Sequence, residues 1–181
     1  MVNHFNLERY GVCEMKKDSN TNAEMKEIVI EAKIENLDVV QDFIANELKT
    51  SSVCPVKVQT QITLAVEEIF VNIARYAYGQ NAWATDPPQS EQSDPAANTL
   101  TVRVAAAGDE IIIEYEDSGI PFNPLEINDP DTTLSIEERE IGGLGIFMVK
   151  KLMDAIKYRY EDNKNILLLI KKSDRSVDKA L

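Results

Sequence analysis

The residue pair best suited to chemistry in the first half of the chain is a glutamate and an asparagine on one predicted helix. Glu68 and Asn72 are four residues apart in "AVEEIFVNIARYAYG", so both side chains project from one helix face. An asparagine oxygen is a neutral ligand for Mg²⁺, and a glutamate can orient or deprotonate a nucleophile. The pair therefore suits a metal–phosphate site, and a polar pair on an exposed helix edge is the alternative.

A second candidate follows an apolar stretch in "YEDSGIPFNP", residues 115–124. Asp117 could accept a hydrogen bond from an amino group such as adenine N6. Gly119 would then let the backbone approach the ring closely, because glycine carries no Cβ. Asp-Ser-Gly is also ordinary turn chemistry at the end of a strand. The motif alone leaves both interpretations open.

The third candidate is "EIGGLGIFMVKKLMD", residues 140–154, where Gly142, Gly143 and Gly145 lead into a predicted helix. The whole chain holds only 7 glycines in 181 residues, so this concentration is unusual. Backbone N–H groups at a glycine-led helix start can surround an anion, and the helix field favours negative charge. The chain has no P-loop, dinucleotide-binding glycine motif or protein-kinase signature. A phosphate bound here would need a different scheme, and a glycine-rich hinge is the alternative.

These motifs are positioned by eight predicted elements in the order strand, helix, helix, strand, strand, helix, strand, strand. Two hairpins and three helices predict an α/β fold, a two-layer α/β sandwich with a mixed, mostly antiparallel sheet and helices on one face. The second helix is predicted over residues 56–78, with Ile62, Ala65, Ile69, Ile73 and Tyr76 on its core side. The other predicted elements cover residues 27–34, 35–50, 99–107, 110–117, 144–154, 155–162 and 165–172.

The length of 181 residues suits one domain, which we expect over residues 27–172. A polar arm (1–26) is expected before it and a tail (173–181) after it, with a loop insertion at 80–98 that is rich in Pro, Ser and Asp. The sequence has no long apolar run and no signal-peptide pattern, so we expect a cytoplasmic protein with no membrane contact. Two distant cysteines without a CxxC motif predict neither a disulfide framework nor a zinc site.

Charge and histidine content exclude several function classes. The net charge of -12 argues against direct nucleic-acid binding, which needs a basic surface. It favours a protein partner or a ligand carried by a metal. The one histidine, His4, lies in the predicted arm, so a Ser-His-Asp triad and a histidine-rich metal site are excluded.

In this order and separation, the three motifs resemble the N, G1 and G2 boxes of the GHKL (Bergerat-fold) ATP-binding superfamily. Within it, the sequence is similar to the bacterial anti-sigma-factor serine kinases. "EEIFVNIARYAY" resembles the N box, "DSGIPFNP" the G1 box and "GGLGIFMVKKLMD" the G2 box. The resemblance covers residues 27–172, and its most specific piece is the G2 box with its Leu-Met-Asp ending.

The resemblance implies a role for each box. Glu68 would be the general base that activates a substrate serine, and Asn72 would hold the Mg²⁺ that bridges the ATP phosphates. Asp117 would recognise adenine, with Gly119 beneath the ring. A lid over the nucleotide would be formed by residues 123–141.

The G2 box would cradle the ATP phosphates through Gly143, Gly145 and the amides around Leu144. Arg75, on the second helix, could also reach a phosphate, and Arg139 could close on the γ-phosphate from the lid. Surface ion pairs with neighbouring acids are the alternative for both arginines.

The last strand departs from the family. Asn165 and Ile166 stand where the family usually has Gly-Thr, whose hydroxyl helps hold the adenine end. Weaker or rearranged adenine contacts are therefore expected.

The function implied by the resemblance is partner switching. Such a protein binds Mg-ATP, sequesters a sigma factor and phosphorylates a serine on an anti-sigma-factor antagonist, commonly as a homodimer. The alternative is a non-catalytic ATP-binding interaction module that controls its partner by lid closure. The catalytic domain of a histidine kinase fits poorly, because no dimerisation helix with a phospho-accepting histidine is found in the sequence.

Overall fold

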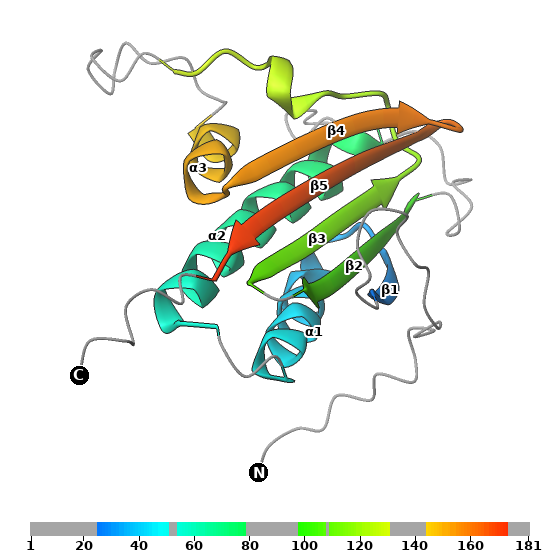
Figure 1. Ribbon diagram of the computed structural model, residues 1–181. Helices are drawn as coiled ribbons and strands as arrows, with labels where there is room; N and C mark the ends of the chain where they lie inside the picture. The colour runs from blue at the N-terminus through cyan, green and yellow to red at the C-terminus, as the bar shows by residue number, and fades with distance from the viewer. Residues whose placement is uncertain (1–24, 51–53, 79–97, 108, 131–143, 174–181) are drawn as a thin grey trace, which may run out of the picture.

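The computed structural model describes residues 25–50, 54–78, 98–107, 109–130 and 144–173. A five-stranded sheet is covered on one face by three α-helices (Figure 1). The predicted two-layer α/β sandwich is therefore confirmed. The elements are β1 (Lys26–Glu31), α1 (Leu37–Thr50), α2 (Val56–Asn72), β2 (Thr99–Ala107), β3 (Glu110–Asp117), α3 (Leu144–Leu152), β4 (Ala155–Glu161) and β5 (Lys164–Lys172), with short 3₁₀ turns at Ile34–Asn36 and Pro124–Glu126.

The strand order is β1-β2-β3-β5-β4, and every neighbouring pair among the described strands is antiparallel. The sequence predicted a mixed, mostly antiparallel sheet, and the two strands joined through α3 are the pair that could have met in parallel. Those strands, β3 and β4, do run parallel, but β5 inserts between them and pairs antiparallel with both. Because β5 lies between them, β3 and β4 do not pair, and the sheet has no parallel pair among the described strands.

The predicted hairpin between β4 and β5 is present, and its turn has two residues. Asp162 and Asn163 both have positive φ, 51° and 59°, which is the signature of a type I′ turn. The turn sets the register of β5, whose second residue, Asn165, lies opposite Asp117 at the end of β3.

The main core lies between the helices and the inner face of the sheet. Alternate residues of each strand point into it, as the two-residue period of a strand requires. The helices contribute the apolar stripes that their spacing predicted. The most deeply buried members include Ile28, Val40, Ile62, Ala65, Val66, Phe70, Leu100, Val102, Ile113, Tyr115, Val149 and Leu169.

The end of α2 corrects one prediction. Tyr76 was expected on the core side of the helix, but its side chain is 50% exposed. The last turn, Ile73–Ala77, is π-helical. Because a π turn bonds residue i to i+5, each residue advances less around the axis, and the side chains fall out of phase with the α-helical stripe. Tyr76 thereby leaves the core.

Within the described ranges, no helix is both long and apolar enough to cross a bilayer. The predicted arm, the 80–98 insertion and the tail lie almost entirely outside the described residues, and so does much of the predicted lid.

Candidate functional site

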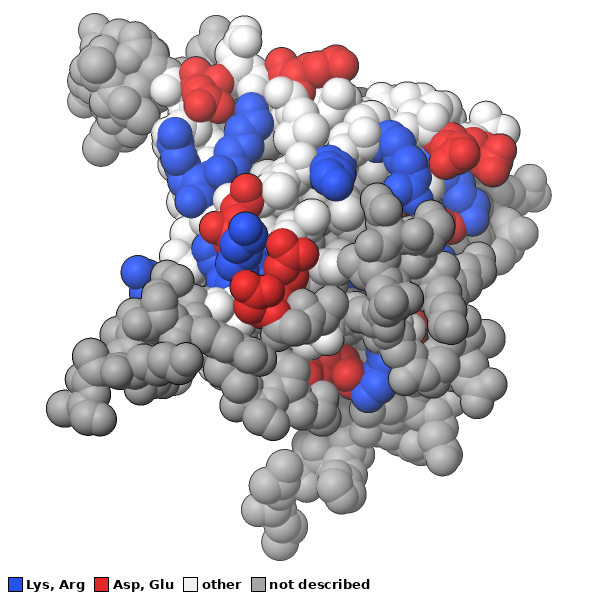
Figure 2. Space-filling view, viewed as in Figure 1, with Lys and Arg blue, Asp and Glu red and all other residues white. Residues whose placement is uncertain are grey.

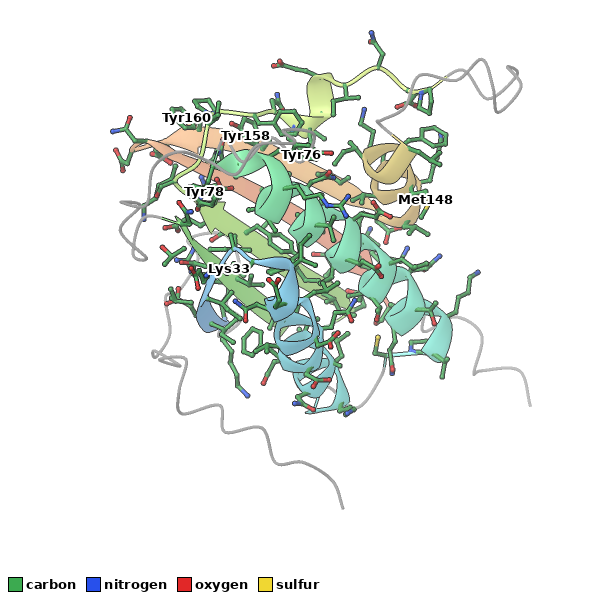
Figure 3. The ribbon with its side chains drawn as sticks, turned by 180° about the vertical axis from the view of Figure 1, so that it is seen from behind. Lys33, Tyr76, Tyr78, Met148, Tyr158 and Tyr160 are labelled. Atoms are coloured by element: carbon green, nitrogen blue, oxygen red, sulfur yellow. The ribbon has the colours of Figure 1, made fainter. Side chains whose placement is uncertain are left out.

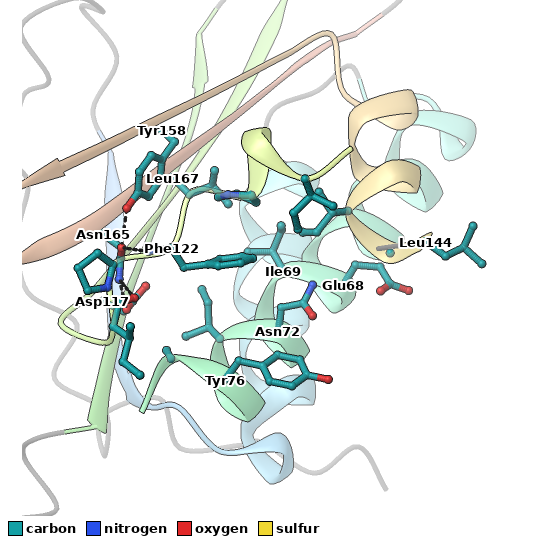
Figure 4. Close-up of a pocket in the computed structure, with 18 residues that line it drawn as sticks. Glu68, Ile69, Asn72, Tyr76, Asp117, Phe122, Leu144, Tyr158, Asn165 and Leu167 are labelled. Carbon is teal, nitrogen blue, oxygen red and sulfur yellow. Dashed lines mark hydrogen bonds between the residues drawn. The ribbon is translucent and has the colours of Figure 1, made fainter. Parts of the chain in front are cut away.

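A cavity of about 570 Å³ opens between α2, the start of α3 and the adjoining ends of β3 and β5 (Figure 4). Its size is that of a small-molecule site. Five of the residues to which the resemblance assigns a role in the nucleotide site line it, although they come from three separate motifs. These are Glu68, Asn72, Asp117, Leu144 and Gly145.

Glu68 and Asn72 lie one turn apart on α2 and face the same end of the cavity (Figure 4). The predicted common face is therefore confirmed. Both side chains are only partly buried, whereas Ile69 beside them points into the core. A carboxylate and an amide oxygen are thus presented to the cavity from a rigid helix.

Gly145, in the first turn of α3, packs against Glu68. A Cβ at this position would collide with Oε2, the flexible end of the Glu68 side chain, so glycine leaves the carboxylate room to lie where it does. The exposed side chain of Leu144 points away from the cavity centre (Figure 4). Gly142 and Gly143 lie outside the described residues, so a phosphate-binding role for Gly143 stays a prediction.

Asp117 lies at the opposite end of the cavity and is only 6% exposed. The backbone N–H of Gly119 and Nδ2 of Asn165 both donate to its Oδ1, each at 2.9 Å. No donor from the described part of the chain bonds to Oδ2. Burial raises the pKa of Asp117, and the hydrogen bonds from Asn165 and Gly119 only partly offset that rise.

Gly119 contacts the protein and is absent from the cavity lining. A Cβ there would collide with the carbonyl oxygen of Ala77 in the π turn. The same carbonyl accepts a hydrogen bond from the N–H of Ile120 at 2.7 Å. The glycine therefore lets the loop after β3 dock on the end of α2, and its predicted place beneath an adenine ring stays untested.

Asn165, noted in the sequence only as a departure, is a site residue that sequence reasoning missed. It lines the cavity, is 6% exposed and bonds directly to Asp117. A signal was available, because a polar residue at the start of an otherwise apolar strand needs a buried partner.

Aromatic side chains form part of the cavity wall and were also missed. Figure 3 shows Tyr76 and Tyr158 at the same end of the molecule, where both line the cavity. Phe122 is 52% exposed, and its ring lies between the Asp117 end and the Glu68 end (Figure 4). Flat apolar surfaces beside a few polar groups suit a planar ring system.

Of the two arginines considered in the sequence, only Arg75 lies in the described residues. Arg75 is exposed on the π turn and does not line the cavity, and Arg139 lies outside the described residues. Lys150 of α3 was not considered. Its Nζ donates to the carbonyl of Ile127 at 2.7 Å and pairs with Asp129 at 3.3 Å. It therefore ties α3 to the described part of the predicted lid.

Comparison with known proteins agrees with this geometry. Residues 30–171, more than half of the chain, match the model of the histidine kinase-like ATPase domain. The chain belongs to the histidine kinase-like ATPase family. The GHKL membership predicted from the three boxes is confirmed, and the family implies that the chain binds ATP.

A relative agrees with the narrower resemblance. The chain is 26% identical over 108 residues to the serine/threonine-protein kinase BtrW of Bordetella bronchiseptica. The aligned region covers 60% of this chain and 66% of that kinase, slightly less than two thirds of its length. The similarity supports an ATP-dependent enzyme of the kinase-like ATPase class.

Proposed function

We propose that this chain is a Mg²⁺–ATP-dependent serine/threonine protein kinase that acts in partner switching. It binds a sigma factor, and it phosphorylates a serine on an anti-sigma-factor antagonist. The observation that carries the proposal is the convergence of Glu68, Asn72, Asp117 and Gly145 on one cavity of a histidine kinase-like ATPase domain. Similarity to a serine/threonine-protein kinase supports the choice of reaction.

The base end of the proposed ATP site is Asp117. Its Oδ1 is occupied by two protein donors, so Oδ2 is the oxygen that accepts a hydrogen bond from the adenine amino group. Phe122 and Ile73 supply apolar wall for the purine and ribose. This arrangement selects the base by one directed hydrogen bond inside a largely apolar cavity.

The phosphate end is built from Glu68, Asn72 and the start of α3. An asparagine oxygen beside nucleotide phosphates fits Mg²⁺, which takes few protein ligands and keeps phosphate oxygens and waters. Mg²⁺ held there by Asn72 would neutralise phosphate charge. The amides around Leu144 and Gly145, at the start of α3, would direct the positive end of the helix dipole at the phosphates.

Glu68 performs the proton transfer. The serine hydroxyl gives its proton to the Glu68 carboxylate while its oxygen forms a bond to the γ-phosphorus. The bond between that phosphorus and the β–γ bridging oxygen breaks, and ADP leaves with the electron pair. Gly145 has no side chain, so it leaves the Glu68 carboxylate space at the phosphate end.

The test is transfer of labelled γ-phosphate from ATP to antagonist-domain proteins encoded by the same genome. Glu68→Gln should keep Mg²⁺-dependent ATP binding and lower transfer by about 10²–10⁴-fold, because it removes the general base. Glu67→Gln is the matched control, since this adjacent glutamate is exposed and does not line the cavity.

Three results would contradict the proposal or a part of it. Transfer unchanged in Glu68→Gln would exclude the assigned base. Tight ATP binding by the wild type without transfer to any antagonist would favour the non-catalytic module instead. ATP binding that persists with EDTA would separately contradict the role of Mg²⁺, which a chain of net charge -12 needs to offset phosphate repulsion.

A further inference from the structure

Asn165 joins four parts of the fold through one buried side chain. Its Nδ2 donates to Asp117 Oδ1 at 2.9 Å and to the carbonyl of Ile120 at 3.1 Å. Its Oδ1 accepts the hydroxyl of Tyr158 at 2.7 Å and the N–H of Phe122 at 3.1 Å (Figure 4). The side chain therefore connects β3, β4 and β5 with the loop that follows β3.

These contacts determine how the Asp117 carboxylate is presented. Both of its protein donors, Gly119 N–H and Asn165 Nδ2, bond to the same oxygen. One donor alone would leave the carboxylate free to turn about its χ2 angle, a soft torsion for aspartate. The second donor comes from a different strand, so together they hold Oδ1 in the protein and leave Oδ2 to the cavity.

The Asn165 side chain also anchors the loop that forms one wall of the cavity. The loop carries Phe122 beside the cavity, and its backbone is bonded to Asn165 at Ile120 and at Phe122. Asn165 therefore holds both Asp117, which would bind the base, and the loop with Phe122, which would pack on it.

We infer that Asn165 is a positioning residue that sets base selectivity by orienting Asp117. The inference rests on the proposed function, in which Asp117 reads the adenine amino group. Asn165 need not touch the nucleotide, because it acts by fixing which carboxylate oxygen meets the 6-amino group.

The chemistry of the side chain explains why an amide serves here. An amide donates through nitrogen and accepts through oxygen, so it can satisfy an acid and a carbonyl on one side and an N–H and a hydroxyl on the other. A hydroxyl has one hydrogen to donate, and a carboxylate has none. Neither can reproduce the full set of contacts that Asn165 makes.

The experiment measures affinity for ATP and for inosine triphosphate, which carries an oxo group in place of the 6-amino group. The wild type should bind ATP at least about tenfold more tightly, because an oxo group gives the Asp117 carboxylate no donor. In Asn165→Ala, ATP affinity should fall while inosine triphosphate affinity changes little, bringing the two within about threefold. Asn46→Ala, an exposed asparagine on α1, is the matched control.

Two further variants keep the test decisive. Tyr158→Phe removes the hydroxyl that donates to Asn165 Oδ1 and preserves the ring, so it should reduce selectivity by a smaller factor. Asn165→Asp is isosteric and loses the donor to Asp117, so it should abolish selectivity. If Asn165→Ala fails to fold, as judged by thermal unfolding, these two variants carry the test.

The outcomes separate the two proposals. An equal loss for both nucleotides in Asn165→Ala would show a merely structural role and overturn the inference. An unchanged ratio in all three variants would overturn it as well. If the wild type binds neither nucleotide in the presence of Mg²⁺, the proposed function fails and this inference fails with it.

Discussion

Two acidic side chains on β3 are equally buried, at 6% exposure each, and have opposite surroundings. Glu114 points to the outer face of the sheet, where Arg103 Nη1 lies 2.6 Å away. Asp117 faces the cavity and receives hydrogen bonds only from uncharged donors in the described residues. A buried acid matched by a cation stabilises the fold, whereas one held by neutral groups with a free oxygen is prepared for a ligand.

The outer cluster is centred on Arg103, which contacts Glu27, Glu114 and Glu116. Figure 2 shows this face of the molecule, on which basic and acidic side chains lie next to one another. Burial alone would lower the pKa of Arg103, but its hydrogen bonds to the three glutamates outweigh that effect and raise it. The three glutamates thus keep the buried Arg103 side chain in its charged form.

Removing Arg103 should have the largest effect on stability. Arg103→Met leaves three glutamates without their main cation, and breaking a buried ion pair costs about 3–5 kcal/mol in the free energy of unfolding. Urea denaturation would measure this loss, and ATP affinity of the folded variant should stay unchanged. Arg159→Met is the control, because that side chain is 51% exposed and should contribute less than about 1 kcal/mol. Equal losses in the two variants would contradict the comparison.

Replacing Asp117 should have a smaller effect. We expect this effect on ATP affinity and not on the free energy of unfolding. Asp117→Asn places an amide where the free carboxylate oxygen lies, so ATP should lose a charge-assisted hydrogen bond of about 1.5–3 kcal/mol. Calorimetry should show affinity about 10–100-fold weaker, with little change in the unfolding transition. Asp109→Asn serves as the control, because Asp109 is exposed and directly precedes the first residue of β3. Unchanged affinity would contradict the assignment of Asp117 to the base.

The smallest effect is a difference in pH dependence between neighbouring acids. Burial would raise the pKa of Glu116, but hydrogen bonds from Lys164 and Arg103 hold it below its ordinary value. Its stabilisation is present above the unfolded-state pKa and is lost as pH falls through the lower folded-state value. The pKa of Asp117 is raised, so its ionisation costs stability at neutral pH and this cost disappears on acidification.

The measurement is the free energy of unfolding of Glu116→Gln and Asp117→Asn relative to the wild type, taken from neutral pH down to about pH 3, across the ordinary carboxyl range. Acidification should reduce the wild-type advantage over Glu116→Gln and should favour the wild type relative to Asp117→Asn. If the two differences in the free energy of unfolding, each taken as wild type minus variant, change with pH in the same direction, the distinction between the two faces is contradicted.

Local patterns in the sequence determined much of this protein. The helix stripes, the hairpins and the three boxes depend on spacing within a few residues, which backbone geometry translates directly into structure. The sequence therefore identified Glu68, Asn72 and Asp117 as site candidates and predicted the two-layer class.

Only the tertiary structure decided how distant segments meet. The insertion of β5 between β3 and β4 made the sheet antiparallel, and the π turn moved Tyr76 out of the core. Asn165 bonds to Asp117 across 48 positions of sequence, and no local period marks that pairing. Such contacts depend on strand order and register, which the balance of packing over the whole chain sets and no short stretch encodes.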